Sequence, residues 1–193
     1  MGSHAVLASL RDLDGTPRGE WGRLLRVKSD DPLRYLAHYP PTVLSQVREL
    51  IAREGLEAWL AARYPDPPVV TNDRALYQYV MELKTAYLKT APPLSRICFD
   101  DKIATLHGAL GQHAYVTRVQ GAKLKAKNQL RVASILKECP PQFLKMVVVH
   151  ELTHLREREH NKPFYQLCCR IEPMYHEYEF GLRLYLTVRD LAR

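Results

Sequence analysis

Residues 150–154 read His-Glu-Leu-Thr-His, a box in which two histidines stand four residues apart. On an α-helix, residues four apart lie on one face, so His150 and His154 can offer two imidazole nitrogens to one divalent cation. Glu151, the next residue round the helix, is then placed to act as general base toward a water that the cation binds. The box therefore predicts a zinc-dependent hydrolase.

The box lies on a segment with apolar residues at helical spacing. The stripe consists of Phe143, Leu144, Val147, Val148, Leu152 and Leu155. It predicts a helix that buries one side and turns its polar side toward a cleft. Pro140 and Pro141 precede the stripe and favour the start of a helix there.

A catalytic zinc site needs a third protein ligand and keeps a further position for water. The candidates after the box are His160, Glu159, Glu172 and His176. A continuous helix would carry His160 to another face and about 9 Å further along the axis, so the helix must end before it. Asn161 and Pro163 favour a new helix start, which predicts a break around residues 159–162. His160 in that break is the favoured ligand. Glu172 and His176 stay open, beyond a short helix at 163–171.

The pattern His150-Glu151-x-x-His154, five residues, His160 and then Asn161-Lys162-Pro163-Phe164-Tyr165 resembles the YgjP-like metallopeptidase family of the zincin and gluzincin group. The resemblance runs over about residues 97–185. It implies a small zincin-like core, with His150, His154 and His160 as ligands of one Zn²⁺ per chain and Glu151 as general base. Metzincins space their histidines in the same way but carry a glycine where this chain has Glu157, so they are the poorer match.

The composition bounds the class of protein. The chain has 193 residues, of which 46% are hydrophobic and 25% charged, as in a globular domain with or without an extension. It contains no apolar stretch of the length that a membrane span requires, and the apolar segment at residues 5–10 is too short for a secretory signal. Gly2-Ser3-His4 resembles the remnant of a purification tag. Four cysteines in no Cys-x-x-Cys pair, namely Cys98, Cys139, Cys168 and Cys169, predict reduced structural thiols and a cytoplasmic protein.

The net charge is +7, and part of it is concentrated in one segment. Its basic residues are Arg118, Lys123, Lys125, Lys127 and Arg131. The alternation at residues 123–127 predicts an edge strand or hairpin arm with its charges on one face. Such lysines either protect an edge from aggregation or attract an anionic small molecule such as a nucleotide. No nucleic-acid recognition motif accompanies them, so we predict no specific nucleic-acid partner and no membrane partner.

Three segments are expected along the chain: a polar leader at 1–32, a helical extension at 33–70 and the metal-binding catalytic domain at 71–193. Helices are predicted at 41–53, 56–64, 73–89, from 141 through the box, 163–171 and 178–191, and strands at 96–100, 114–120 and 129–135. This order predicts an α+β fold in which a twisted sheet lies above the active-site helix. For the extension, three roles stay open: scaffold, control of substrate access, or inhibitory cover.

A zinc-dependent metallopeptidase acting on a peptide or protein is the first functional prediction. The alternative is a metal-dependent hydrolase of a nucleotide phosphoanhydride, with the basic strand at 118–131 binding phosphate. A non-enzymatic module holding a structural metal is the third. The candidate donors to a reaction intermediate are Tyr175, His176, Tyr178 and Arg183, and the candidate carboxylate partners of the ligands are Glu172 and Glu177. The oligomeric state is left open.

Overall fold

The computed structural model describes residues 31–103, 111–120 and 123–192, with only the backbone described within 111–127. The predicted leader lies outside these residues except for its last two. The chain divides into two compact units. Unit 1 contains the described residues up to Pro65 together with those from Phe180 onward, and unit 2 contains Asp66–Glu179. The division predicted at residue 70 remains a prediction.

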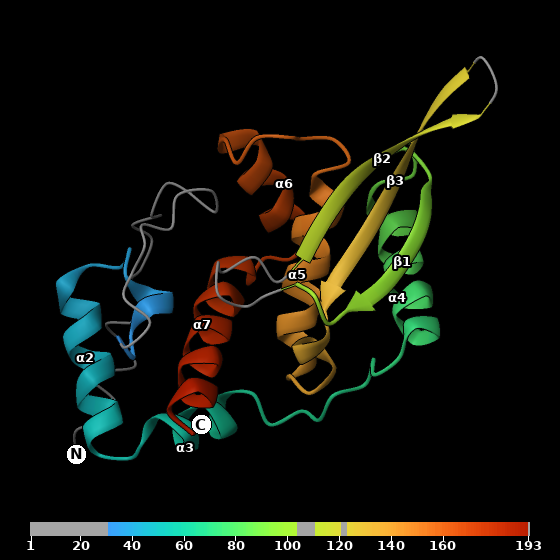
Figure 1. Ribbon diagram of the computed structural model, residues 1–193. Coiled ribbons are helices and arrows are strands. Elements are labelled where there is room, and N and C mark those ends of the chain that lie inside the picture. The colour runs from blue at the N-terminus through green and yellow to red at the C-terminus, as the bar shows by residue number, and fades with distance from the viewer. Residues whose placement is uncertain (1–30, 104–110, 121–122, 193) are drawn as a thin grey trace. The chain divides into compact units, whose positions relative to one another are not determined.

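Unit 1 is helical. It contains η1 (Arg34–Leu36), α2 (Pro41–Ala52), α3 (Leu56–Arg63) and the larger part of α7 (Tyr175–Leu191), as Figure 1 shows. Val43 and Val47 are buried one helical turn apart on α2, as the apolar spacing predicts. The Arg183 guanidinium donates a hydrogen bond of 2.9 Å to the Tyr35 carbonyl. The helices predicted at 41–53 and 56–64 are confirmed to within one residue.

Unit 2 contains a three-stranded sheet in the order β1-β3-β2. β1 (Leu94–Asp100) runs parallel to β3 (Lys123–Ala133), and β2 (Gly111–Gln120) runs antiparallel to β3. The β1 pairing reaches only as far as Asn128, whereas β2 pairs with β3 along its whole length. Residues 123–127 therefore pair with β2 alone within the described sheet, and the predicted hairpin arm is confirmed. The strand predicted at 129–135 is the other end of β3, which continues into η3 (Ser134–Lys137).

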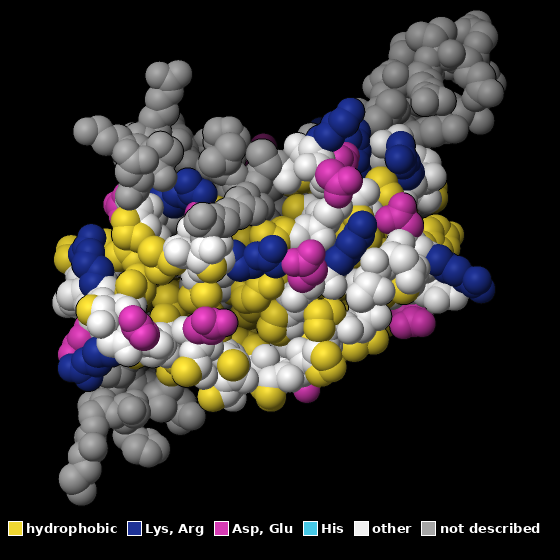
Figure 2. All heavy atoms as spheres, turned by 60° about the horizontal axis from the view of Figure 1, so that its bottom comes forward, with side chains coloured by type: hydrophobic (Ala, Val, Ile, Leu, Met, Phe, Trp, Pro, Cys, Tyr) yellow, Lys and Arg dark blue, Asp and Glu magenta, His cyan; other side chains and the backbone are white. Residues whose placement is uncertain are grey.

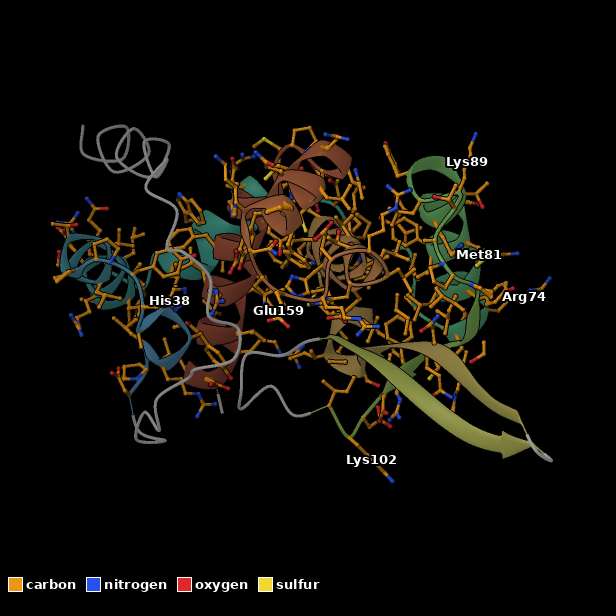
Figure 3. All side chains as sticks on the ribbon, turned by 90° about the horizontal axis from the view of Figure 1, so that it is seen from above. His38, Arg74, Met81, Lys89, Lys102 and Glu159 are labelled. Carbon is orange, nitrogen blue, oxygen red and sulfur yellow. The ribbon has the colours of Figure 1, made fainter. Side chains whose placement is uncertain are left out.

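Two helices of unit 2 cover one face of this sheet (Figures 1 and 3). α4 (Asp73–Tyr87) contacts β1, α5 (Pro141–Thr153) contacts β2 and β3, and the two helices contact each other. The Asp73 side chain accepts a hydrogen bond of 2.9 Å from the backbone N–H of Phe99, which ties the start of α4 to β1. α6 (Lys162–Ile171) packs on α5. The predicted α+β class is confirmed.

α5 is buried almost all round. Every residue from Met146 to Thr153 is buried, His150 and Glu151 included, each with only 5% of its surface exposed. The expectation of one buried stripe opposite a polar face is therefore wrong. Neighbours on several sides explain the difference, since β2 and β3, α4 and α6 all pack against this helix. Its polar side chains must find partners inside the protein, because an unpaired buried polar group is costly.

α5 also ends earlier than predicted. Its last residue is Thr153, not a residue near 159. Beyond it the backbone tightens into a turn, in which the N–H of Leu155 bonds to the Leu152 carbonyl at 3.1 Å and the N–H of Arg156 to the Thr153 carbonyl at 2.9 Å. The apolar spacing stops at Leu155, so nothing buries a further helical turn. The loop at 154–161 therefore begins inside the box.

α7 begins at Tyr175, three residues before the predicted start. The Glu172 carboxylate accepts a hydrogen bond of 3.1 Å from the N–H of Met174, just before the helix.

No helix in the described parts of the chain is long and apolar enough to cross a membrane. On the face in Figure 2, Lys and Arg side chains are interspersed with Asp and Glu.

Candidate metal centre

The side chains of His150, His154 and His160 converge on one point of unit 2. The Nε2 atoms of His150 and His154 lie 3.3 Å apart, those of His150 and His160 3.1 Å, and those of His154 and His160 3.0 Å. No other group of three potential metal ligands occurs among the described residues. Of the four candidates for a third partner, the structure thus brings His160 to the box.

The loop after α5 places His160. α5 supplies His150 from its last turn, and His154 follows as the residue that caps the helix. Asn161 begins α6 by accepting a hydrogen bond of 3.0 Å from the Phe164 N–H, which confirms the predicted cap. His160 is therefore held between two helix ends, close in the chain to both.

Two of the imidazoles have partners on the nitrogen that faces away from the cluster. His154 Nδ1 lies 3.0 Å from the carbonyl oxygen of Glu157. A carbonyl only accepts, so Nδ1 carries the proton and, in the neutral ring, Nε2 offers its lone pair. His150 Nδ1 lies 2.7 Å from the hydroxyl of Tyr175. Ligand imidazoles in metal sites are usually oriented by such bonds.

A buried aromatic ring supports the three imidazoles. The centroid of Phe164 lies 4.9 Å from that of His150, 4.7 Å from that of His154 and 4.8 Å from that of His160. Phe164 is fully buried. It shields one side of the cluster from water and lowers the local dielectric, which strengthens electrostatic interactions there.

Burial lowers the pKa of His154 below 6.5, more than hydrogen bonds with the backbone at Glu157 and Arg158 raise it. The pKa of His160 is lowered by burial first and by the neighbouring His154 second. Both rings are therefore neutral at pH 7, which is the form that binds metals. Burial also raises the pKa of Tyr175 well above 10, so its hydroxyl stays protonated.

The donor set fits a small divalent cation. Zinc takes imidazole nitrogens at about 2.0–2.1 Å in a tetrahedron, whose corners are then about 3.3–3.4 Å apart. The Nε2–Nε2 spacings of 3.0–3.3 Å are close to that value. Three neutral imidazoles suit zinc and other borderline transition metals better than magnesium or calcium, which prefer oxygen.

The other predicted candidates lie elsewhere. Glu159 is exposed on the loop before α6 (Figure 3). Glu172 is buried and paired with Lys145, whose Nζ lies 2.5 Å from its Oε2. His176 is partly exposed and its Nδ1 lies 3.7 Å from Glu179. Among the described residues the ligand atoms that lie together are those of His150, His154 and His160, so neither Glu172 nor His176 joins the cluster.

The residues predicted as hydrogen-bond donors to a reaction intermediate also lie in different places. Tyr175 is fully buried and bonded to His150, so its position is that of a ligand partner. Arg183 belongs to unit 1, where it donates to the Tyr35 carbonyl. Tyr178 and Glu177 are partly buried on α7, and their proposed roles stay predictions.

Sequence reasoning missed the supporting roles of Tyr175 and Phe164. Phe164 stands within the quoted family pattern, three residues after the Asn161 cap, and that spacing was the available signal. Tyr175 is 25 residues from His150 in the chain, and no local pattern links them.

Comparison with known proteins gives two matches. The family model for the YgjP-like metallopeptidase domain matches residues 117–184, which contain the whole cluster. The protein named UTP pyrophosphatase from Escherichia coli (strain K12) is 52% identical over 161 residues, which are 83% of this chain and 96% of that protein. The chain belongs to the YgjP-like family. No solved structure matches it significantly.

Both matches place this YgjP-like protein among the hydrolases, so the sequence-based prediction of an enzyme is confirmed. The two matches differ in the class of substrate that their names imply. The family description points to peptides, whereas the name of the relative points to a nucleotide. The substrate therefore has to be argued separately.

Proposed function

We propose that this YgjP-like protein is a zinc-dependent hydrolase that cleaves a phosphoanhydride bond of a nucleoside triphosphate, with UTP as the first substrate to test. The observation that carries the proposal is the 52% identity to a UTP pyrophosphatase across 96% of that protein's length. This puts the nucleotide, which the sequence analysis held as the alternative, ahead of the peptide.

In this proposal His150, His154 and His160 hold one Zn²⁺ through their Nε2 atoms. A cation bound there supplies Lewis acidity, which lowers the pKa of a water and polarises a phosphoryl oxygen. Three histidines leave a further coordination position, as catalytic sites require. Because the ligands are neutral imidazoles, the site keeps a positive charge, which favours a polyanionic substrate.

Glu151 acts as the general base. It follows His150 on α5 and is buried with 5% of its surface exposed. It accepts a proton from the attacking water while the water oxygen bonds to the α-phosphorus, and the bond from that phosphorus to the bridging oxygen breaks. The products are a nucleoside monophosphate and pyrophosphate, and the carboxyl group returns its proton to the solution or to the leaving group.

The basic strand at 118–131 is the proposed phosphate-binding element. Arg131 is excluded from that role, because its Nη1 lies 3.0 Å from Asp100 Oδ2 and the pair joins β3 to β1. The proposal therefore falls on Arg118, Lys123, Lys125 and Lys127, whose side chains lie outside the described residues. α5 contacts both strands of the hairpin that carries them, and the closing end of the hairpin extends away from α5 in Figure 1. A role in phosphate binding therefore requires the basic side chains to reach back along the hairpin toward α5.

The second candidate is a zinc-dependent peptidase with a zincin-like core. It is favoured by the family description, and by β2, which is an edge strand of the described sheet and could hold an extended peptide through main-chain hydrogen bonds. The cytoplasmic location predicted from the reduced cysteines belongs to the proposal as well. None of the four cysteines, all of which lie in the described residues, forms a disulfide bond, and three of them are buried.

The deciding experiment uses the zinc-loaded full chain and its Glu151→Gln variant, with UTP, the other nucleoside triphosphates and unstructured peptides as substrates. We expect about one zinc per chain in both proteins. We expect pyrophosphate release from UTP that falls about 10²–10⁴-fold in the variant. Peptide cleavage that depends on Glu151, without nucleotide hydrolysis, would instead establish the second candidate. A protein that binds zinc but hydrolyses neither substrate would refute both candidates.

A further inference from the structure

Two further aromatic rings lie beside the metal centre, and both belong to unit 2. Tyr165 is near the start of α6, and His176 is the second residue of α7. Their ring centroids lie 5.7 Å apart, and the ring planes are tilted by 34°. The Tyr165 centroid is also 6.4 Å from that of His160, with 32° between the planes. A surface of two rings therefore adjoins one of the three proposed ligands.

These two rings differ in exposure from the rings behind them. Phe164 and Tyr175 lie 5.3 Å and 6.4 Å from Tyr165 between centroids, and both are fully buried. Tyr165 is half-buried, and 40% of the His176 side chain is exposed. The aromatic cluster that supports the ligands therefore reaches the protein surface at Tyr165 and His176.

The backbone holds both rings at helix starts. The N–H of Tyr165 bonds to the carbonyl of Asn161, the residue that caps α6, at 3.2 Å. At the start of α7, the N–H of Tyr175 bonds to the Glu172 carbonyl at 3.0 Å, and His176 follows directly. Rings fixed in this way lose little conformational entropy when a ligand binds to them.

Flat aromatic side chains next to a centre that cleaves phosphoanhydrides fit a nucleobase. Every base has a π-face, and stacking on aromatic side chains is a common way for proteins to bind bases outside a duplex. In a nucleoside triphosphate only the ribose separates the base from the α-phosphate. A base-binding surface must therefore lie close to the group that binds that phosphate, and the contact of Tyr165 with His160 meets this condition.

We propose that Tyr165 and His176 form the surface on which the base of the nucleotide stacks. The inference rests on the proposed function and adds the residues that bind the part of the substrate remote from the cleaved bond. Stacking needs the ring and not the phenol hydroxyl, so phenylalanine can replace Tyr165 in this role.

The test compares UTP with inorganic triphosphate, which has the phosphates but no base. Both are titrated calorimetrically into the zinc-loaded Glu151→Gln protein, in which turnover is slow. Adding Tyr165→Leu should weaken UTP binding about 5–150-fold and leave inorganic triphosphate binding unchanged. Tyr165→Phe should keep the affinity for both. In the active enzyme, Tyr165→Leu should raise KM for UTP with little change in kcat.

Tyr77→Leu is the matched control, because it makes the same change at a tyrosine of α4 that is 49% exposed. It should leave the affinity for both ligands unchanged. His176→Leu repeats the comparison from the other helix and should also weaken UTP alone. It decides the question if Tyr165→Leu does not retain zinc, because His176 lies outside the metal cluster.

Unchanged UTP affinity in zinc-loaded Tyr165→Leu and His176→Leu, or equal losses for UTP and inorganic triphosphate, would overturn the inference. If the wild-type protein still hydrolyses UTP in that case, the proposed function stands and the stacking surface alone is refuted. If the wild-type protein does not hydrolyse nucleoside triphosphates, the proposed function falls, and the inference falls with it.

Discussion

Zinc should raise the melting temperature of this protein strongly, and the effect should depend on His160. The three Nε2 atoms lie 3.0–3.3 Å apart, close to the spacing of about 3.3–3.4 Å between the corners of a tetrahedral zinc site. The three donors therefore fit a zinc ion. At a free zinc concentration 1,000 times Kd, the folded state gains about 4.1 kcal/mol. For a chain of 193 residues this corresponds to a rise of about 8–16 °C.

His160→Ala should remove at least about a third of that rise, and about two-thirds of it if binding weakens 100-fold. Loss of a ligand weakens binding by at least the 10–100-fold that follows loss of a ligand's outer partner. A 100-fold loss is about 2.7 kcal/mol, or about 5–11 °C of the zinc-induced shift. The assay is thermal unfolding of chelator-stripped protein with and without zinc. His176→Ala is the matched control, because it deletes a histidine of the same unit that lies outside the cluster.

An equal zinc-induced shift in His160→Ala and the wild type would refute the reasoning, since the third imidazole would then not hold the cation. Loss of the shift in His176→Ala alone would refute it as well, because the ligand set would be a different one. Neither result depends on knowing the substrate.

Two further predictions follow from the same site. The metal-free protein should lose stability as the pH falls below about 6.5, measured by denaturant unfolding at a series of pH values. Burial lowers the folded-state pKa of His154 and His160, so the unfolded chain binds more protons in this window and the stabilisation present above it is lost. Constant stability from pH 7 to pH 5 would contradict this. Asn161→Ala and Asn72→Ala should each cost about 1 kcal/mol of stability, since each removes a helix cap. Only the former should also weaken zinc binding, because it alone adjoins His160, and equal zinc affinity in the two variants would argue against that link.

The sequence by itself determined the features that depend on near neighbours in the chain. Helical geometry places His150 and His154 on one face whatever surrounds them, and Glu151 comes with them. The Asn161 cap and the proline after it separate His160 from the first helix, which made a return to the cluster possible. Paired prolines, caps and alternating residues likewise located most helices and the hairpin arm.

The tertiary structure decided what depends on residues far apart in the chain. The burial of α5 on nearly all sides arises from β2, β3, α4 and α6 together, and one helix's periodicity cannot reveal how many neighbours it has. The end of α5 at Thr153 likewise depends on where that packing stops. Tyr175 meets His150 only because α7 begins beside α5. His160 lies with the box, whereas Glu172 is paired with Lys145, and the sequence left both open as the third ligand. Local spacing fixes which groups can face the same way, whereas packing fixes which of them meet.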